Sequence, residues 1–515
     1  MVEAPPICVP HGEPLPAHAR AAAPSRLALP RGADALLLLV VLALAVALFD
    51  LLPSSFNVDS WLDLTVGRYI WEAGLPHHNV LTVMAHGAPW VDQQWLSQLF
   101  SYLLDRIGGL GLVGLVDVAA MTVGVAIAIA AARRLGARPL SVIVLLPLCL
   151  LQVLPSHEVR TQAYALPLAS ATILLLALDS RRPSRQVYWC LPILLLWSNL
   201  HGTAILGVAL VGLRALTLLW ERRQTLLRDP MQWRQPLMLG LGATLCVLLT
   251  PYGTQMISYY RSTSGSGALR HLVSEWQPIT ALPTLAVPFF ILAAILVWSF
   301  GRAPENTTSW DKLATLLLAG ITIGVLRNAL LFGLCALVVG PVSIDGVVGR
   351  WRSGKAPERA RLNAVLGAAV LVALVAGIAV TLLRPQAQFE FSYQRAPILR
   401  VVRHETAGDP SLQVFGDERF ADWLLWRDPA LAGRVAYDAR FELLSPEQMD
   451  SLVALFSAAG ADWKQAARGD RLLVLDRTAT PDAVRGFLAE PGRRVLYDDG
   501  TRVVILRAAT EAAQG

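Results

Sequence analysis

Long, nearly uncharged runs of residues constrain this chain more than any other feature of its sequence. Examples are residues 35–52, 110–132, 140–154, 161–178 and 362–383, none of which holds more than one charged side chain. A helix of about 20 apolar residues crosses a bilayer. Only 16% of the residues are charged, whereas soluble domains approach about a quarter. These runs predict a mostly α-helical, polytopic membrane protein.

Hydropathy divides the chain into about 11 spans of this kind. The expected spans are 34–52, 109–132, 139–155, 162–178, 187–199, 201–220, 235–250, 281–300, 312–326, 328–345 and 362–383. A disordered tail, 1–33, precedes them, and the first long loop occupies 53–108. We therefore expect a transmembrane region at 34–383, followed by a second domain at 384–515.

Positive charge marks alternate loops between these spans. The basic residues of these loops are Arg133, Arg134, Arg138, Arg181, Arg182, Arg185, Arg222, Arg223, Arg228, Arg350, Arg352, Lys355, Arg359 and Arg361. Loops rich in Lys and Arg stay in the cytoplasm, which predicts a cytoplasmic N-terminal tail. An odd number of spans then places 384–515 on the extracytoplasmic side.

The loops predicted to face outward hold the unusual polar motifs of the chain. They are 53–108, 156–160, 199–202, 250–278 and the Arg327-Asn328 pair. The reactive surface is therefore expected on the outer side. The cysteines lie in apolar spans or, for Cys8, in the tail, and they show no spacing typical of metal ligands.

Beyond residue 395 the sequence alternates between short strand patterns and helical patterns. Strands are expected at 412–415, 435–437, 471–475 and 503–506, and helices at 417–427, 446–460 and 480–489. Such alternation is typical of a small α/β domain, and the segment is long enough to form its own core. It holds no Gly-rich phosphate loop, nucleophile elbow or metal motif, which favours a structural or acceptor-binding module.

Asp59 lies a few residues beyond the first span. A carboxylate at the membrane surface can act as a general base or bind a divalent cation. It can equally be a helix N-cap, because Asp is a preferred capping residue. Asp63 follows four residues later and would share a helix face with Asp59. It is either a second, substrate-binding acid of one site or a solvated surface residue.

Asp92 lies between Trp90 and Trp95 in the same loop. Tryptophans are typical of the membrane interface, and residues 93–106 have the pattern of an amphipathic helix lying along the membrane. Asp92 is therefore either the cap of that helix or a second catalytic carboxylate.

Arg160, His201 and Arg327 are ionisable residues at or inside the membrane edge. Placing a cation there is costly, so it usually has a partner or a function. Arg offers a planar fork that suits a lipid phosphate. The alternatives are snorkelling or pairing with Glu158 for Arg160, a hydrogen-bonded turn for His201 and an exposed hairpin tip for Arg327.

Glu275 and Trp276 are adjacent in a loop that is expected to face outward. An acid beside an aromatic ring can bind a sugar, with the ring stacking on the sugar face. The alternative is an interfacial segment that Trp276 anchors in the membrane.

Several short segments follow one another along this chain in a particular order. They are Asp59 to Gly67, Gly74-Leu75-Pro76, Gly87-Ala88-Pro89-Trp90-Val91 with Trp95-Leu96, Asn199-Leu200-His201-Gly202, Pro251-Tyr252-Gly253, Glu275-Trp276-Gln277-Pro278, Arg327, Ala421-Asp422-Trp423-Leu424-Leu425-Trp426 and Gly433-Arg434-Val435-Ala436-Tyr437-Asp438-Ala439-Arg440. In this order they resemble the bacterial members of the GT-C glycosyltransferase superfamily, especially polytopic proteins related to dolichyl-phosphate-mannose-type transferases. The resemblance covers most of the chain.

The resemblance implies an inverting enzyme that moves a sugar from a polyprenyl-phosphate donor to an envelope glycan, lipid or protein acceptor on the outer face. It implies that Asp59 acts as a base or helps bind a divalent cation. Arg160, His201 and Arg327 would then contact the donor phosphate. The implied partners are a lipid-linked sugar donor and membrane lipids, and we expect no nucleic-acid partner.

The chain departs from its relatives at two places. They often have His where Asp63 stands, and a His-Glu pair where Gln93-Gln94 stands. The missing glutamate leaves three possibilities open: Asp92 takes its role, one carboxylate suffices, or the chain is no longer catalytic.

Two other functions compete with glycosyl transfer. A transporter or flippase for a lipid-linked glycan would show internal repeats and charges within its spans, and Asp117 and Arg214 are such charges. A non-catalytic scaffold for envelope assembly would instead function through 384–515.

Overall fold

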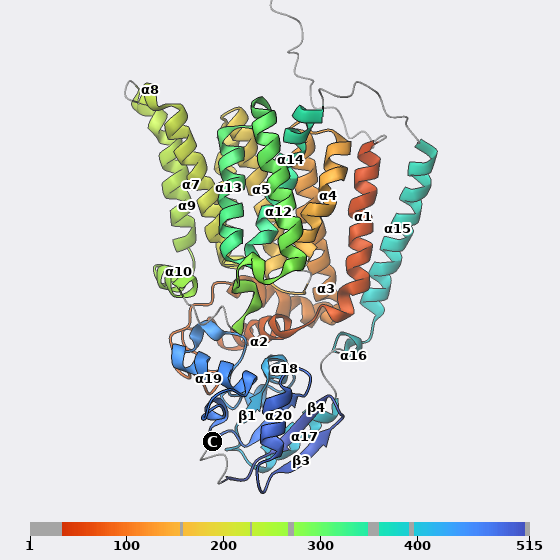
Figure 1. The fold of residues 1–515 in the computed structure, drawn as a ribbon, viewed down its shortest axis with the longest axis vertical. Helices are drawn as coiled ribbons and strands as arrows, with labels where there is room; N and C mark the ends of the chain where they lie inside the picture. Colours follow the sequence, from red (N-terminus) through yellow and green to blue (C-terminus); the bar gives the residue numbers. More distant parts are fainter. Residues whose placement is uncertain are drawn as a thin grey trace, which may run out of the picture.

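The computed structural model describes residues 33–154, 158–226, 229–265, 272–348, 360–390 and 396–509. A helical bundle forms one end of the molecule, and a smaller α/β domain forms the other (Figure 1). The predicted tail lies outside the described residues except for Ala33, and so do Arg228 and the basic residues predicted at 350–359.

Each predicted span corresponds to a helix of the bundle. These helices are α1 (Ala33–Leu51), α3 (Trp95–Arg134), α4 (Pro139–Val153), α5 (Gln162–Arg181), α6 (Cys190–Leu200), α7 (Ala204–Glu221), α9 (Arg234–Leu248), α12 (Pro283–Arg302), α13 (Ser309–Gly324), α14 (Ala329–Val348) and α15 (Ala360–Leu383). Within the described residues, 6 helices are long and apolar enough to cross a membrane, and shorter apolar helices accompany them. The protein is therefore a polytopic helical membrane protein.

The centre of the bundle is α14, which packs against α3, α4, α5, α12 and α13. All of its residues from Ala329 to Ser343 are buried. In contrast, α15 lies at the edge of the bundle beside α1 (Figure 1). The apolar residues that α15 exposes suit contact with lipid.

The first long loop, 53–108, folds into helices that cross one end of the bundle (Figure 1). Here α2 (Val58–Ala73) begins after its N-cap Asn57, whose backbone N–H donates to Ser60 Oγ at 3.2 Å. The chain then enters α3, which bends at Gly108 and Gly109. Gly109 has φ +67°, a conformation that favours glycine. The helix predicted at 93–106 is thus the first limb of α3.

Short helices connect the longer ones at both ends of the bundle. They include α8 (Arg223–Leu226), α10 (Gln255–Gly265), η5 (Ser274–Trp276), η6 (Ile279–Ala281) and η8 (Leu326–Asn328).

The C-terminal domain, residues 396–509, contains a small mixed sheet. Its elements are α17 (Ala396–Gly408), β1 (Val414–Gly416), α18 (Glu418–Arg427), η10 (Phe441–Leu443), α19 (Pro446–Ser457), β2 (Leu472–Asp476), α20 (Pro481–Leu488), β3 (Arg494–Asp498) and β4 (Arg502–Leu506), and α16 (Gln386–Phe389) precedes it. The strand order is β1-β2-β4-β3, with β1 parallel to β2 and the other pairs antiparallel.

Three details of this domain differ from the sequence-based prediction, and the first is that the helix α17 was not predicted. The prediction of a strand at 435–437 is wrong, because Val435 forms isolated bridges, one to Thr82 and one to Val414, and no strand. The strand β3 was not predicted, since its residues are largely exposed and carry no apolar alternation.

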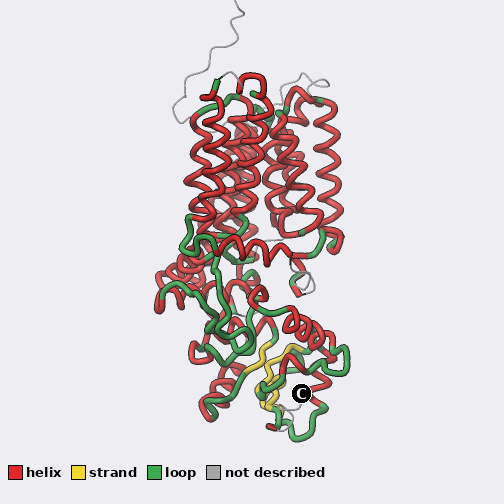
Figure 2. The backbone as a smooth tube through the Cα atoms, turned by 90° about the vertical axis from the view of Figure 1, so that its left-hand side faces the viewer, coloured by secondary structure: helices red, strands yellow, loops and turns green. Residues whose placement is uncertain are grey.

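The C-terminal domain is joined to the first long loop by backbone hydrogen bonds. Val83 N donates to Val435 O, Met84 N to Ala436 O and Gly433 N to Leu81 O, each at 2.8 Å. Residues of both segments also share one hydrophobic core, which includes Phe56, Trp61, Trp90, Trp423 and Val435. Figure 2 shows the loops that lie between the bundle and the sheet.

Candidate functional site

A polar cavity of about 130 Å³ lies where the first long loop meets the C-terminal domain. Its lining residues are Asp59, Leu62, Asp63, Gln93, Gln94, Arg160, Thr161, Gln162, His201, Tyr259, Thr263, Val273, Glu275, Trp276, Arg327, Ala439, Arg440, Phe441 and Glu442. Asp59, Asp63, Arg160, His201, Glu275, Trp276 and Arg327 were all predicted from the sequence. The fold therefore brings these distant residues to one cavity.

Asp59 lies in the first turn of α2, with 43% of its side chain exposed. The alternative interpretation of Asp59 as the N-cap is wrong, because Asn57 occupies that position. Asp59 Oδ2 instead accepts a hydrogen bond from Arg160 Nη1 at 3.0 Å. An exposed carboxylate with one oxygen fixed in this way can direct its other oxygen toward a bound hydroxyl group.

Arg160 is buried and is surrounded by carboxylates. Its Nη1 lies 3.0 Å from Asp59 Oδ2 and 3.7 Å from Glu158 Oε2, and its Nη2 pairs with Glu275 Oε1. The backbone N–H of Arg160 donates to Asp117 Oδ1 at 3.2 Å. Because these acids neutralise its charge, Arg160 is suited to hold Asp59 and Glu275 in place.

Glu275 is the second carboxylate held by Arg160. Burial alone would raise the pKa of Glu275, but the charges of Arg160 and Arg327 together hold it below its ordinary value. Glu275 is therefore ionised at neutral pH.

Asp63 is buried, with 3% of its surface exposed, so the solvated-surface interpretation is wrong. Gln94 Nε2 and Gln98 Nε2 each donate to its Oδ1 at 3.3 Å, and Thr161 N donates to its Oδ2 at 3.1 Å. Burial, and then the nearby charge of Asp59, raise the pKa of Asp63 well above its ordinary value despite these donors. Asp63 thus joins α2 to α3 and to residue 161.

His201 has its ring fixed by neighbours. Trp197 Nε1 donates to Thr203 Oγ1 at 3.1 Å, which leaves the Thr203 hydroxyl to donate to His201 Nδ1 at 2.8 Å. Thr203 N also donates to Nδ1 at 3.2 Å. Burial, then the charges of Arg327 and Arg160, lower the pKa of His201 well below its ordinary value. The neutral ring therefore carries its proton on Nε2 and is a hydrogen-bond donor.

Arg327 lies over the ring of Trp276, with its guanidinium carbon 5.1 Å from the ring centroid. Within the part of the chain that the structure describes, no carboxylate forms an ion pair with Arg327, and its buried Nε has no hydrogen-bond partner. This cation is therefore available to an anionic ligand.

An amphipathic cavity of about 210 Å³ adjoins the polar one and shares His201, Arg327 and Trp276 with it. Its apolar lining comes mainly from Ile205, Leu206, Ile321 and Val325, with Tyr259 and Tyr260. A cation at the boundary between a polar and an apolar space suits the head of an anionic lipid.

Comparison with known proteins identifies the architecture. No protein-family model and no curated protein matches the sequence. Among solved structures, the chain is similar to ArnT from Cupriavidus metallidurans bound to undecaprenyl phosphate, with 15% identity, a TM-score of 0.48 and coverage of 92% of this chain and 98% of that one. It is similar to archaeal oligosaccharyltransferase AglB from Archaeoglobus fulgidus, in complex with an inhibitory peptide and a dolichol-phosphate, with 11% identity, a TM-score of 0.50 and coverage of 92% and 74%. It is also similar to arabinofuranosyltransferase AftD from Mycobacteria, with 15% identity, a TM-score of 0.50 and coverage of 93% and 40%.

The chain has the GT-C glycosyltransferase fold. At these identities the likeness concerns the fold, and the chain spans less than half the length of AftD. The predicted fold class, a polytopic GT-C-like helical protein with a small C-terminal α/β domain, is confirmed.

Asp92 is a predicted site residue that the GT-C fold does not bring to the polar cavity. It is buried and accepts a hydrogen bond from Gln94 N at 3.3 Å, just before α3 begins. Burial raises the pKa of Asp92 to about 7. In this position Asp92 orders the turn that leads into α3.

The C-terminal domain adds residues to the cavity that sequence reasoning missed, chiefly Arg440 and Glu442. Arg440 Nη2 pairs with Asp438 Oδ2 at 2.5 Å and donates to Asn79 Oδ1 at 2.9 Å. The resemblance already included Arg440 in the segment that begins at Gly433, and this was the available signal. Glu442 lies two residues beyond that segment.

A divalent cation is the remaining expectation for a site of this GT-C fold. Within the described residues, no group of three or more His, Cys, Asp or Glu side chains is arranged to hold a metal ion. Asp59 and Glu275 are already bound to Arg160. These residues therefore do not form a site in which the protein alone could bind a metal ion.

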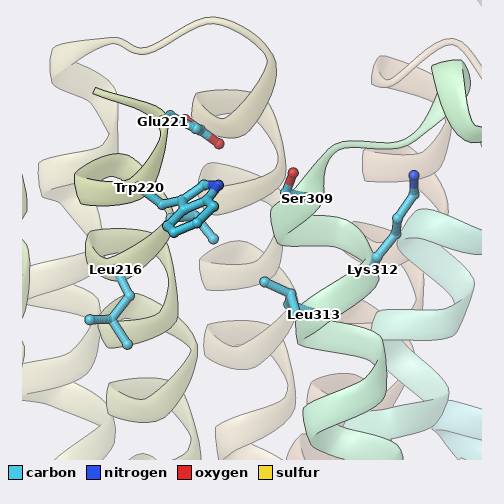
Figure 3. Close-up of a pocket in the computed structure, with 7 residues that line it drawn as sticks. Leu216, Trp220, Glu221, Ser309, Lys312 and Leu313 are labelled. Carbon is cyan, nitrogen blue, oxygen red and sulfur yellow. The ribbon is translucent and has the colours of Figure 1, made fainter. Parts of the chain in front are cut away.

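A larger cleft, of about 490 Å³, lies at the opposite end of the bundle, between α7 and α13 (Figure 3). Its labelled residues are Leu216, Trp220, Glu221, Ser309, Lys312 and Leu313. The Glu221 carboxylate lies 3.1 Å from Arg214 Nη1. This cleft contains none of the predicted site residues, so the candidate site of the GT-C fold is the polar cavity.

Proposed function

We propose that this protein is a membrane glycosyltransferase that moves a sugar from a polyprenyl-phosphate donor to a hydroxyl acceptor. The observation that carries the proposal is the junction of two cavities. The polar one presents the exposed carboxylate of Asp59, and the amphipathic one presents Arg327 and His201 beside an apolar wall. The dolichol-phosphate in the AglB structure supports a lipid-phosphate donor, because that protein has the same fold.

The donor binds in the amphipathic cavity. Its phosphate contacts the Arg327 guanidinium and the Nε2–H of His201, while the polyprenyl chain follows Ile205 and Leu206. Charge-assisted hydrogen bonds of this type are stronger than neutral ones. The Trp276 ring, against which Arg327 packs, lies between the two cavities and contacts the sugar.

The acceptor binds in the polar cavity with its hydroxyl group on Asp59. Arg160 positions Asp59 and Glu275 through its ion pairs. The acceptor oxygen attacks the anomeric carbon directly, and polyprenyl phosphate leaves with the electron pair of the broken C–O bond. A single displacement of this kind inverts the anomeric centre. This arrangement makes the membrane region at 34–383 the donor side and assigns 384–515 to the acceptor side.

The reaction takes place on the outer face of a bacterial plasma membrane in this proposal. The support is the position of charge along the bundle. The helix α8, which begins at Arg223 and directly follows Arg222, lies at the end opposite the C-terminal domain (Figure 1). Positive loops stay in the cytoplasm, so the N-terminal tail is cytoplasmic and the polar cavity faces outward, where envelope acceptors are found.

A transporter or flippase is less well supported. The charges within spans that would favour it have local partners. Arg214 Nε lies 2.8 Å from Asp179 Oδ2, and Asp117 accepts the backbone N–H of Arg160. Both residues are also buried within the bundle.

Sugar transfer by the full-length protein in lipid nanodiscs tests the proposal. A panel of radiolabelled polyprenyl-phosphate sugars is offered with envelope extract as acceptor, with and without a chelator. Asp59→Asn should lower the rate by about 100-fold or more, because the acceptor hydroxyl loses the carboxylate that orients it. The control is Glu72→Gln, an exposed acid on the same helix, which should retain the rate. Equal transfer by wild type and Asp59→Asn would contradict the proposal, and a non-catalytic scaffold predicts that neither protein transfers sugar.

A further inference from the structure

Glu442 belongs to the C-terminal domain, yet it lines the polar cavity together with Asp59 and Arg160. The proposed function requires a group that takes the proton of the acceptor hydroxyl. We propose that Glu442 receives this proton while Asp59 orients the hydroxyl, so that the C-terminal domain supplies a catalytic residue to the membrane region. This inference rests on the proposed function.

The segment that carries Glu442 is fixed from several directions. Ala439 N donates to Asp422 Oδ2 at 3.0 Å, and Arg440 N donates to Asp438 Oδ1 at 3.0 Å. The Arg440 side chain reaches Asn79 in the first long loop. The first two bonds fix the segment within its domain and the third ties it to the loop, and η10, which follows directly, carries Glu442 at the cavity.

The other carboxylates of the cavity are already engaged. Asp59 and Glu275 bind Arg160, and buried Asp63 accepts three hydrogen bonds. Glu442 forms no ion pair with any of the residues that the structure describes. Pairing with a cation stabilises the charged form of a carboxylate and weakens its affinity for a proton. Glu442 is therefore a better proton acceptor than Asp59 or Glu275.

The surroundings of Glu442 shift its pKa toward a value that suits a proton acceptor. Burial raises the pKa of Glu442 to about 7, the charges of Asp438 and Asp59 add to the rise, and Arg440 opposes it. The ionisable groups of Asp92, just before α3, and of Tyr259, on α10, also interact electrostatically with Glu442. A base with a pKa near the working pH combines an available ionised form with a strong affinity for protons.

This placement also accounts for the departure at Gln93-Gln94. Gln94 cannot act as an acid, and it holds Asp63 and Thr161 instead. The second carboxylate of the site comes from Glu442, more than three hundred positions further along the chain.

Sugar transfer in this proposal breaks two bonds and forms two. The acceptor O–H bond breaks and its proton moves to a Glu442 carboxylate oxygen, while the acceptor oxygen forms a bond to the anomeric carbon. The bond from that carbon to the phosphate oxygen breaks, and its electron pair leaves on polyprenyl phosphate. Protonated Glu442 then releases its proton to water.

Glu442→Gln in the full-length protein tests this role, with sugar transfer measured between about pH 5 and pH 9. The wild-type rate should rise with pH through about 7, because the carboxylate form is the active one. In Glu442→Gln, kcat should fall about 100-fold, the rise near pH 7 should vanish, and the KM for the donor should be unchanged. Glu442→Asp should recover part of the rate, and Glu447→Gln, an exposed acid of the same domain, should match the wild type.

The outcomes separate this inference from the proposed function. If Glu442→Gln keeps both the rate and the pH dependence while Asp59→Asn loses activity, Glu442 is not the proton acceptor and the glycosyltransferase proposal stands. If the wild type transfers no sugar, the proposed function fails and this inference fails with it. A thermal melt of each variant shows that it is folded.

Discussion

Arg440 of the C-terminal domain lies over the ring of Trp90 in the first long loop, with 4.1 Å between its guanidinium carbon and the ring centroid. The same side chain pairs with Asp438 and donates to Asn79. Arg440 therefore connects the sheet domain to the loop that also carries Asp59. This contact explains how a residue near the C-terminus takes part in a site at the end of the bundle.

Arg440→Ala should loosen the C-terminal domain. The substitution leaves the buried Asp438 carboxylate without its partner, and such a loss costs about 3–5 kcal/mol. We expect a lower midpoint of thermal unfolding and faster cleavage of the C-terminal domain by a protease. Arg485→Ala is the control, because Arg485 is exposed and pairs with Asp482 on the same helix. Equal melting of both variants would contradict a docking role for Arg440.

The sequence predicts the helices well and the site only in part, for a physical reason. Apolar runs determine where a helix crosses the membrane, so every predicted span is a helix. Burial of Asp63 depends on Gln98 and Thr161, which reach it only when α2 packs on α3. Arg160 and Glu275 were both recognised, but their pairing is a tertiary contact that no local pattern contains.

Glu442 shows the same limit more sharply. The segment that carries the resemblance ends at Arg440, two residues before Glu442. Only the docking of Val435 and Ala436 on residues 83 and 84 brings it to Asp59. Spacing along one chain cannot reveal a site that two segments far apart in the sequence build together.

His201 should make stability fall as the solution becomes acidic. The pKa of His201 is depressed in the folded protein, so below about pH 6.5 the unfolded chain binds a proton that the folded chain does not. The contribution of His201 to the free energy of unfolding is therefore complete above that pH. It is lost as the pH falls, by up to about 1.4 kcal/mol per pH unit. His201→Gln should flatten this dependence in melts between about pH 7 and pH 5. Parallel curves for the two proteins would show that His201 is protonated in the fold.

Arg327→Gln should weaken donor binding without abolishing turnover. Hydrogen bonds to a charged group contribute about 1.5–3 kcal/mol, which corresponds to a rise of roughly 10–100-fold in the KM for the polyprenyl-phosphate sugar. Arg261→Gln, at an exposed position on α10, is the matched control. A fall in kcat at unchanged KM would instead place Arg327 at the reacting centre, away from the bound phosphate.

Gly67→Ala should separate α2 from α3. A Cβ atom on Gly67 would lie 2.1 Å from the backbone oxygen of Gln98, a clash that only a shift of one helix relieves. Overpacking of this kind costs about 1–3 kcal/mol. Gln98 also donates to Asp63, so activity should fall together with the melting midpoint. Gly320→Ala on α13 is the control, since a Cβ there meets no atom within 4 Å and gains up to about 1 kcal/mol of helix propensity. If Gly67→Ala melts at the wild-type temperature, then α2 and α3 leave room for a Cβ atom at Gly67, and the expected clash with Gln98 is wrong.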